Sequence, residues 1–319
     1  MDVRRMGLKT PAGFGAGPQG FGGVPGGSRR GTGERNAGLR SLGVVPDGPR
    51  RGVGERGESM ALVCPLFSGS RGNSYFVGTK QAGVLVDAGR SAKQMGEMLA
   101  RAGIDPLAIQ GILVTHEHGD HVKGVRVFAR KYRTPVFASK GTLRAMAEKW
   151  TDFPTCEMPR ALQLAGLTIC GFHTSHDCAE ALGYRIRTPE DGVVCVATDT
   201  GFLSEEVRES LYGADFVVLE SNHDLDMLRT GPYPYHLKRR ILSDQGHLSN
   251  ADCAAFLPRL ARSGTTRFLL AHLSEENNTQ TLALETAREA LVRAGLSQGT
   301  DFLLGVAKAA NDSGRSIFF

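Results

Sequence analysis

Four side chains that bind metals or protons stand within six positions of this chain, directly behind a run of apolar residues. The stretch ILVTHEHGDH, residues 112–121, contains His116, His118, Asp120 and His121. Crowding these groups at the end of a predicted strand costs free energy through repulsion and loss of water, unless a charged partner holds them together. Two interpretations compete: a solvated polar loop, and a metal centre whose other ligands come from farther along the chain.

Other residues that can bind a metal also follow apolar runs. They are Asp87 in VDAG, His176 in TSHD, Asp199 in ATDT and His272 in LLAHLS. Because a rigid sheet presents the residues at its strand ends to one edge, we expect these side chains to join the HEHGDH cluster. His173 lies close to His176, but its place in the strand alternation favours a residue that faces solvent or core.

The order of predicted elements indicates an α/β fold. Predicted strands cover 61–67, 75–78, 82–89, 111–115, 134–139, 167–175, 182–188, 192–200, 214–221, 267–274 and 301–308. Predicted helices cover 91–103, 122–132, 142–150, 226–242, 249–263 and 280–294. The strands form two runs, each interleaved with helices, which predicts two sheets packed face to face with helices outside.

Residues 1–59 differ in composition from the rest of the chain. They hold 17 of the 41 glycines, and VPGGSRRGTGER at 24–35 recurs as VPDGPRRGVGER at 45–56. A segment this rich in glycine and poor in periodic hydrophobicity does not pack, so we expect a disordered Gly/Arg-rich extension. We interpret it as an upstream stretch included by a misassigned start, with Met60 as the true start, in preference to a functional basic tail.

The net charge of +5 belongs to that extension, which has ten basic and five acidic residues. The remaining 260 residues hold 28 of each sign. Net charge therefore gives no indication of a nucleic-acid surface on the folded part, and only local clusters of basic residues can do so.

The cysteines and the hydropathy favour a cytoplasmic protein with no membrane partner. No close CxxC pair is present, which is typical of reduced thiols. No apolar run is long enough to cross a bilayer, and the amino terminus lacks the apolar region of a signal peptide. The six scattered cysteines are Cys64, Cys156, Cys170, Cys178, Cys195 and Cys253.

With these partners in this order, the HxHxDH stretch resembles the metallo-β-lactamase superfamily, and longer stretches resemble its YycJ/WalJ group of bacterial metallohydrolases. These stretches are MALVCPLFSGSRGNS, THEHGDHVKGV, TSHDCAEALGYRI, ATDTG, LESNHDLDMLRTGPYPYHLKRRILSDQGHLSN and AHLSEENN. The resemblance covers essentially all of residues 60–319 and has no counterpart before Met60. It implies a four-layer αβ/βα sandwich, a hydrolase domain over 60–319, and a two-metal site along one sheet edge.

The resemblance also implies a set of metal ligands. His116, His118 and His176 bind one metal, Asp120, His121 and His272 bind the other, and Asp199 bridges the two. Imidazole and carboxylate suit Zn²⁺ or Mn²⁺, and a bridging carboxylate keeps two cations roughly 3.5 to 4 Å apart. Asp87 is assigned to orient a ligand imidazole, and His223 is either a similar supporting group or a buried, hydrogen-bonded histidine.

Two divalent ions lower the pKa of water enough to supply a bridging hydroxide near neutral pH, so a metal-dependent hydrolase is implied. The leaving oxygen of a phosphodiester also needs a proton. Glu220 and His247 resemble the Glu and His that assist this step in tRNA-processing members of the superfamily. The predicted catalytic residues are therefore Asp120, Glu220 and His247.

A nucleic-acid substrate, with DNA favoured, is indicated by local basic clusters and by the group's association with 5′ to 3′ exonuclease action on DNA. No β-CASP insertion, the extra domain of several nuclease relatives, is visible between Asp199 and His272. The basic residues are Arg126, Arg130, Lys131 and Arg133, and then Lys238, Arg239 and Arg240. Predicted substrate contacts in the SGSRGNS loop are Ser68, Ser70, Asn73 and Ser74.

Two other functions remain open from the sequence. One is a non-catalytic, metal-binding regulatory module that keeps the site for stability, because bound metal adds folding free energy. The other is a hydrolase of small phosphodiesters or esters. Glu220 and His247 argue against the first, since a structural metal site needs no proton relay, and the basic clusters favour a phosphodiester over an acyl substrate.

Overall fold

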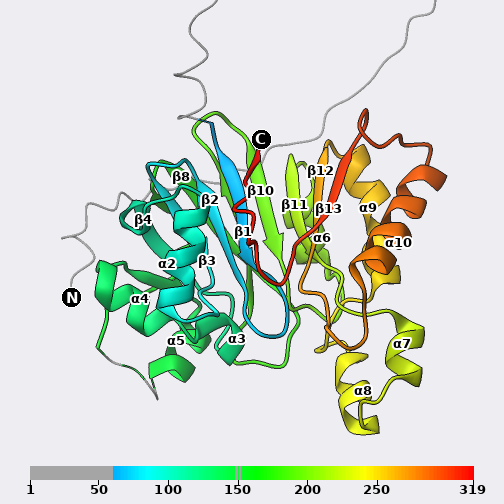
Figure 1. The fold of residues 1–319 in the computed structure, drawn as a ribbon, viewed down its shortest axis with the longest axis horizontal. Coiled ribbons are helices and arrows are strands. Elements are labelled where there is room, and N and C mark those ends of the chain that lie inside the picture. The colour runs from blue at the N-terminus through cyan, green and yellow to red at the C-terminus, as the bar shows by residue number, and fades with distance from the viewer. Residues whose placement is uncertain (1–59, 148–149, 151) are drawn as a thin grey trace, which may run out of the picture.

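The computed structural model describes residues 60–147, 150 and 152–319, and the predicted disordered extension 1–59 lies outside these described residues. Two seven-stranded sheets pack face to face with helices on their outer faces (Figure 1). The predicted α/β fold, a four-layer αβ/βα sandwich, is thereby confirmed.

Each sheet is a continuous row of strands. The first has the order β14 (Ile317–Phe318), β1 (Leu62–Phe67), β2 (Ser74–Gly78), β3 (Gly83–Val86), β4 (Ile109–Leu113), β5 (Val136–Ala138) and β6 (Thr155–Glu157). The second has the order β13 (Leu303–Val306), β12 (Arg267–Ala271), β11 (Phe216–Glu220), β10 (Val193–Ala197), β9 (Leu182–Arg187), β8 (Leu167–His173) and β7 (Leu162–Leu164).

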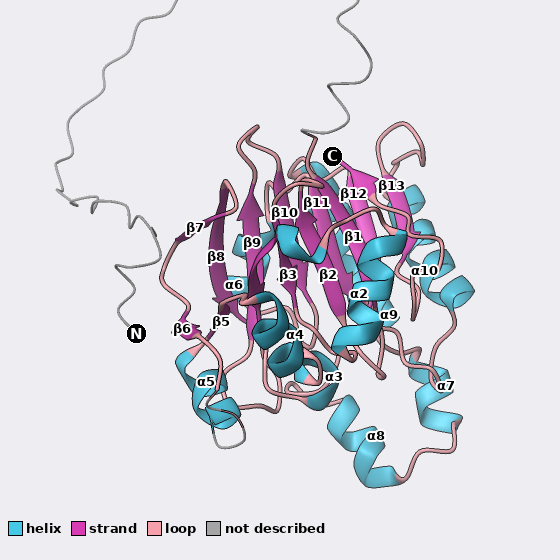
Figure 2. Ribbon diagram, turned by 60° about the vertical axis from the view of Figure 1, so that its left-hand side comes forward, coloured by secondary structure: helices cyan, strands magenta, loops and turns pink. Residues whose placement is uncertain are grey.

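Helices follow the strands on both sides of the sandwich (Figure 2). The first half contains α2 (Ala92–Arg101), the 3-10 turn η2 (Pro106–Ala108), α3 (Gly119–Val122), α4 (Val125–Tyr132) and α5 (Lys140–Ala147). The second half contains α6 (Glu205–Leu211), α7 (Leu225–Thr230), α8 (Tyr235–Ile241), α9 (Asn250–Arg262) and α10 (Gln280–Arg293). Both views show α7 and α8 projecting from one edge of the sandwich. None of the helices described here is long and apolar enough to span a membrane.

Alternating side chains along the strands divide the core into three buried layers. Val63 on β1 and Val194 on β10 share the layer between the two sheets. Cys64 packs instead among residues of α2 and α4, and Cys195 among residues of α6, α9 and α10. The central strands are therefore buried on both faces, which explains why they appear in the sequence as apolar runs without alternation.

The strands that carry the predicted ligands end at one edge of the sandwich. β3 is parallel to β4, and β10, β11 and β12 are parallel to one another. Because the carboxyl ends of parallel strands meet at the same edge, the residues that follow them lie together. At the opposite edge, Leu62 at the start of β1 pairs with Phe318 of β14.

Two helix predictions are corrected by the structure. The predicted helix 226–242 is two helices, α7 and α8, separated by the GPYP turn that begins at Gly231. Proline offers no backbone N–H to continue a helix, so Pro234 starts a new one. The predicted helix 122–132 is also divided, because α3 begins at Gly119 inside the HEHGDH cluster and ends before Gly124.

Five short elements were missed, namely β6, β7, β14, α6 and the 3-10 turn η2. The three strands have two or three residues each, too few to show a period of two. Helix α6 did have a signal, because Ser204 caps its first turn by accepting a hydrogen bond from the Val207 backbone N–H, ahead of two glutamates.

Candidate metal centre

The predicted ligands occupy the ends of strands in both sheets. Asp87 follows β3, Asp199 follows β10 and His272 follows β12, and all three have positive φ, at 63°, 56° and 54°. Residues other than glycine rarely adopt this left-handed conformation, which costs of order 1–3 kcal/mol and persists where surrounding contacts hold it. The strained turns direct these side chains across the edge of the sandwich.

Close backbone packing joins the loop after β3 to the HEHGDH cluster. The Ala88 N–H donates to the His121 carbonyl at 2.9 Å, and the Asn73 N–H donates to the Asp120 carbonyl at 2.8 Å. Gly89 makes this approach possible, because a Cβ there would lie 1.7 Å from the Asp120 carbonyl oxygen. The cluster is therefore fixed to the first sheet by its own backbone.

The structure brings all seven predicted metal ligands together, along with Glu220 and His247. Four groups share the property that one ligand atom from each member lies within 4.8 Å of the others. These are His116, His118 and His176; Asp120, His121 and His272; His116, His121 and Asp199; and Asp199, Glu220, His247 and His272.

Three imidazoles converge in the first group. His116 Nε2 lies 3.0 Å and His176 Nε2 3.3 Å from the same atom, His118 Nδ1. His176 Nδ1 donates to the Gly246 carbonyl at 3.0 Å, so its Nε2 carries a lone pair. Burial lowers the pKa of His176 and, with the neighbouring imidazole of His121, lowers that of His116 well below its usual value. Nitrogen lone pairs thus face one another.

Carboxylates surround the imidazoles of the second group. Asp120 Oδ2 lies 3.5 Å from His121 Nε2 and 3.7 Å from His272 Nε2. Asp199 reaches both imidazoles, with Oδ2 3.4 Å from His121 Nε2 and Oδ1 3.3 Å from His272 Nδ1. Burial opposes the charged form, but these carboxylates raise the pKa of His272 to about 10 and that of His121 well above its usual value.

Asp87 contacts the imidazole of His121 from behind. Its Oδ2 accepts a hydrogen bond from His121 Nδ1 at 2.7 Å and one from the Thr115 hydroxyl at 2.8 Å, while Oδ1 accepts from the Thr115 N–H. Because Nδ1 is occupied in this way, His121 Nε2 faces Asp120 and Asp199. Asp87 therefore lies outside the group of facing ligand atoms.

Glu220, the last residue of β11, orients imidazoles from the second sheet as Asp87 does from the first, but it makes more contacts. Its Oε1 accepts hydrogen bonds from His247 Nδ1 and His272 Nδ1, both at 2.8 Å. Its Oε2 accepts from the backbone N–H groups of Thr200 and Leu248. Burial acts to raise the pKa of Glu220, but the imidazoles outweigh it and hold that pKa below the usual range. Glu220 thus positions two imidazoles, and only His247 of the predicted relay lines a cavity.

His223 does not join this network. Its ring is buried, and neither ring nitrogen has a hydrogen-bond partner among the described residues. Burial lowers its pKa to about 4, so the ring is neutral. Both predicted roles, a support for the ligands and a hydrogen-bonded core histidine, are contradicted by this geometry. His173 lies apart as well, exposed and beside Glu206.

Most of the predicted substrate contacts in the SGSRGNS loop are buried supports. Ser68 Oγ accepts the His272 N–H at 2.8 Å and bonds to the Tyr75 hydroxyl. Ser74 Oγ donates to the Asp87 carbonyl. Both hydroxyls are thus used to fix the backbone at residues of the candidate metal centre, and the prediction that Ser68 and Ser74 contact substrate is wrong. Asn73 Nδ2 is buried 3.1 Å from His121 Nε2. Of the four, Ser70 lines cavities at the surface.

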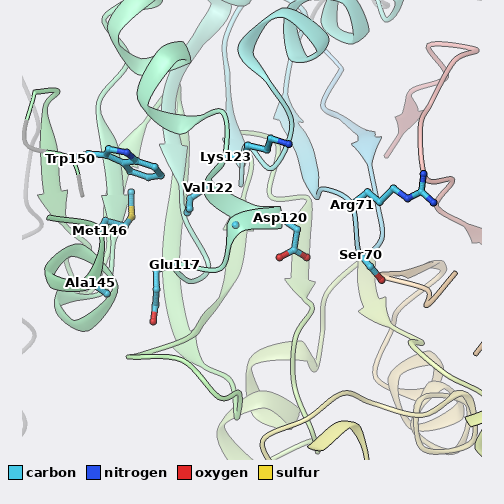
Figure 3. Close-up of a pocket in the computed structure, with 10 residues that line it drawn as sticks. Ser70, Arg71, Glu117, Asp120, Val122, Lys123, Ala145, Met146 and Trp150 are labelled. Atoms are coloured by element: carbon cyan, nitrogen blue, oxygen red, sulfur yellow. The ribbon is translucent and has the colours of Figure 1, made fainter. Parts of the chain in front are cut away.

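Two adjoining cavities open at this edge. The metal cavity, about 210 Å³, is lined by five of the seven predicted ligands, all except His116 and His121, and by His247. Residues of the α7–α8 arm, 225–241, also line it, including Tyr233 and Arg240. The Trp150 cavity, about 520 Å³, is lined by α3, α5 and the SGSRGNS loop (Figure 3). Ser70 and Asp120 line both.

The two predicted basic clusters lie in different places. Arg240 lines the metal cavity and forms a two-bond ion pair with Asp177. Arg126 and Arg130, in contrast, pair with Asp152 and line a separate surface pocket on α4 together with Lys131. The sequence therefore placed the α4 cluster closer to the site than it is, because Arg126, Arg130 and Lys131 line neither of the two cavities at the site.

Residues 83–273 match the family model described as the beta-lactamase superfamily domain. Exodeoxyribonuclease YycJ of Bacillus anthracis is 39% identical over 242 residues, which cover 74% of this chain and 91% of that protein. Exodeoxyribonuclease WalJ of Streptococcus pneumoniae is 38% identical over 244 residues, which cover 74% of this chain and 90% of that protein.

Solved structures show the same fold at low sequence identity. The metallo-beta-lactamase fold protein YhfI from Bacillus subtilis superposes with a TM-score of 0.61 at 14% identity, over 82% of this chain and 100% of that one. Unliganded yeast PDE1 gives a TM-score of 0.62 at 13% identity, again over 82% and 100%.

Proposed function

This chain belongs to the metallo-β-lactamase superfamily and to its YycJ/WalJ group, and on that premise we propose that it is a two-metal-dependent hydrolase of phosphodiester bonds that degrades DNA from the 5′ end. The observation that carries the proposal is the meeting of seven metal-binding side chains with His247 at one cavity. The names of the two relatives support DNA as the substrate.

We assign two cations, Zn²⁺ or Mn²⁺, to the ligand cluster. His116, His118 and His176 would hold the first, Asp120, His121 and His272 the second, and Asp199 both. The donor set supports the assignment, because imidazole and carboxylate suit these metals. When bound, two such ions would supply hydroxide near neutral pH and stabilise negative charge on a phosphoryl oxygen.

Buried polar atoms without partners favour cations at this place. Asp199 Oδ2 and His272 Nε2 are buried, and neither has a hydrogen-bond partner among the described residues. His118 Nδ1 can carry one proton at most, yet two lone-pair nitrogens face it. Buried polar atoms without partners cost free energy, and a metal would relieve this cost by binding the Asp199 oxygen and the histidine nitrogens and by displacing the proton of His272.

His247 is the residue that we assign to proton transfer. Its Nδ1 donates to Glu220, so the ring is held in one orientation, and its side chain is 13% exposed where it lines the metal cavity. A second proton, on Nε2, makes the ring an imidazolium beside the Glu220 carboxylate, and that proton would pass to the leaving oxygen of the phosphodiester. Glu220 acts in this scheme through His247 and His272 and contacts no substrate.

The α7–α8 arm supports a long anionic substrate. Arg240 faces the metal cavity, while Arg239 stacks over the exposed ring of Tyr235 farther out. Guanidinium groups bind phosphate with paired N–H donors, and aromatic rings stack on bases. We propose that a DNA strand leaves the cavity along this arm. We also propose a cytoplasmic location, which the six free cysteines favour.

The test is digestion of 5′-labelled and 3′-labelled DNA by the full chain with added Mn²⁺ or Zn²⁺, with labelled RNA of the same sequence beside it. We expect metal-dependent release of the 5′ label as the first product from DNA. Early release of the 3′ label would overturn the proposed polarity, and faster loss of RNA would overturn the choice of DNA.

Three variants separate the roles. Asp120→Ala is expected to lose both metal content and activity, and His247→Ala to lose turnover while retaining metal. His173→Ala, a matched loss of an exposed histidine outside both cavities, is expected to change neither. If the wild type binds two metals and cleaves neither polymer, the nuclease proposal fails, and the same preparation then tests small phosphodiesters.

A further inference from the structure

The Trp150 cavity has a composition that the metal chemistry does not require. Figure 3 shows Trp150, Met146 and Val122 grouped at one end, the Asp120 carboxylate in the middle, and Ser70 and Arg71 at the other end. Met146 and Val122 are buried, and Trp150 is half-buried against them. The cavity thus has an apolar, aromatic end beside the predicted metal ligands.

Charged groups line the rest of this cavity. Lys123 and Arg71 are exposed cations on its wall, and Arg71 also pairs with Glu275 at 2.6 Å. Glu117 is the one lining acid besides Asp120 among the described residues. Its oxygens accept hydrogen bonds from the Ala179 N–H and the Thr142 hydroxyl, so its charge is already engaged away from a ligand.

Size and continuity identify a class of ligand. A volume of about 520 Å³ falls in the range of small-molecule sites, roughly 300–1,000 Å³. An aromatic ring beside apolar side chains suits the face of a nucleobase, and cations beside a metal cavity suit the phosphates on either side of its sugar. Because Ser70 and Asp120 line both cavities, the two cavities adjoin, and a ligand longer than one nucleotide can extend from one into the other.

We propose that the Trp150 cavity binds the terminal nucleotide of the DNA strand, with its base against Trp150 and Met146 and its phosphate beside Lys123 and Arg71. The bond to be cut then lies in the adjoining metal cavity. This inference rests on the proposed nuclease function and names the form of its substrate, a strand end whose last nucleotide is unpaired. An unpaired terminal base enters without the breaking of a base pair, so an unpaired end is expected to bind more tightly than a paired one.

The chain contains a single tryptophan, Trp150, so its intrinsic fluorescence reports on this cavity. The full chain is titrated with a deoxynucleoside 5′-monophosphate, with inorganic phosphate, and with the deoxynucleoside alone, using Trp150→Phe as the blank. We expect saturable quenching by the mononucleotide, weaker quenching by the nucleoside, and none by inorganic phosphate. Absence of quenching by the mononucleotide overturns the proposal.

A pair of lysine variants tests the phosphate contact. Lys123→Ala removes a cation from the cavity wall and is expected to weaken mononucleotide binding about tenfold, the effect of one charge-assisted hydrogen bond. Lys93→Ala removes an exposed lysine of α2 that lines neither cavity, and it is expected to change nothing. Equal binding by the two variants overturns the phosphate placement.

A second readout uses DNA as the ligand. Trp150→Ala is expected to raise KM for single-stranded DNA about tenfold with kcat retained, since stacking on one base is lost, and Trp150→Phe is expected to restore most of the affinity. A KM that stays at the wild-type value in Trp150→Ala overturns the proposal. Active cleavage without mononucleotide binding would refute this cavity alone, whereas binding without cleavage would refute the nuclease function.

Discussion

Two buried carboxylates, Asp87 in the first sheet and Glu220 in the second, hold the candidate metal centre in different ways. Asp87 orients the single imidazole of His121 and depends on the side chain of Thr115. Glu220 orients two imidazoles and is itself held by two backbone N–H groups. The two sheets therefore support the ligands unequally. Asp87 holds one imidazole and can adapt to a change, whereas Glu220 links several loops and is held rigidly.

The largest effect on activity is expected at Asp199, which lies beside both the imidazole that Asp87 holds and an imidazole that Glu220 holds. Asp199 faces His121, which Asp87 holds, and His272, which Glu220 holds. Asp199→Ala should reduce DNA cleavage by at least about a thousandfold and lower the metal content, because the proposed ligand to both cations is lost. Metal analysis of the purified protein and end-labelled cleavage measure it. Retention of both metals would exclude Asp199 as the bridging ligand.

Glu220→Gln should have the next largest effect. The amide –NH₂ must face either two imidazole N–H groups or two backbone N–H groups, so it opposes donors at each position. Losing the orientation of two imidazoles, at about 10- to 100-fold each, predicts roughly a thousandfold loss of kcat/KM. An effect of only a few-fold would show that the two imidazoles hold their positions without Glu220.

The pH dependence of metal binding should differ between the imidazoles that Asp87 and Glu220 contact and the imidazoles that neither carboxylate contacts. His121 and His272 have raised pKa values, that of His272 at about 10, so a metal must displace their protons and its affinity rises with pH. His116 and His176 have lowered pKa values and are already neutral.

Calorimetric titration from about pH 6 to about pH 8 should therefore show one metal whose affinity rises about 10,000-fold and one whose affinity changes little, since each of the two displaced protons contributes about tenfold per pH unit. Equal pH slopes for the two metals would contradict the assignment of ligands to two separate sets.

Asp87→Asn should cost about tenfold in kcat/KM, less than the matched change at Glu220. The amide oxygen can take the Oδ2 position and still accept from His121 Nδ1 and the Thr115 hydroxyl, so that only the Thr115 backbone N–H at the Oδ1 position meets the –NH₂ group. Parallel assays of the two amide variants measure the difference. A loss equal to that of Glu220→Gln would remove the distinction between the two supports.

Thr115→Val is expected to have the smallest effect on activity, and it tests how much Asp87 depends on the Thr115 hydroxyl. It removes the hydroxyl that donates to Asp87 Oδ2 but keeps the backbone bond to Oδ1. We expect a two- to threefold loss of kcat/KM and about 1 kcal/mol less free energy of unfolding in the metal-free protein. Thermal unfolding measures the second quantity. Glu220 has no equivalent weak point, because its Oε2 is held by main chain.

The sequence predicted best what is local. HEHGDH gathers its side chains within six residues, and apolar runs revealed the strands that end at Asp199 and His272. The prediction that ligands from the two sheets meet came from the family resemblance. The spacing of residues within one strand does not indicate which edge of the other sheet will lie beside it. The strained φ values at these strand ends had no signal in the sequence, because neither residue is glycine.

The predictions that failed depended on where side chains turn after the chain folds. Ser68 and Ser74 belong to a turn-rich loop typical of phosphate contacts, yet their hydroxyls bond to the backbone near His272 and Asp87. Arg126 and Arg130 follow the ligand loop in sequence, but helix periodicity directs them to Asp152. Such outcomes follow from packing, which a linear pattern does not record.

The pairing of Leu62 with Phe318 places the carboxyl terminus at the edge of the sandwich opposite both cavities (Figure 1). Phe319 is therefore a natural attachment point for a surface linker or a fluorescent reporter. An enzyme immobilised there would present to the solution the edge that we propose binds DNA, while the anchor stays clear of the substrate's path.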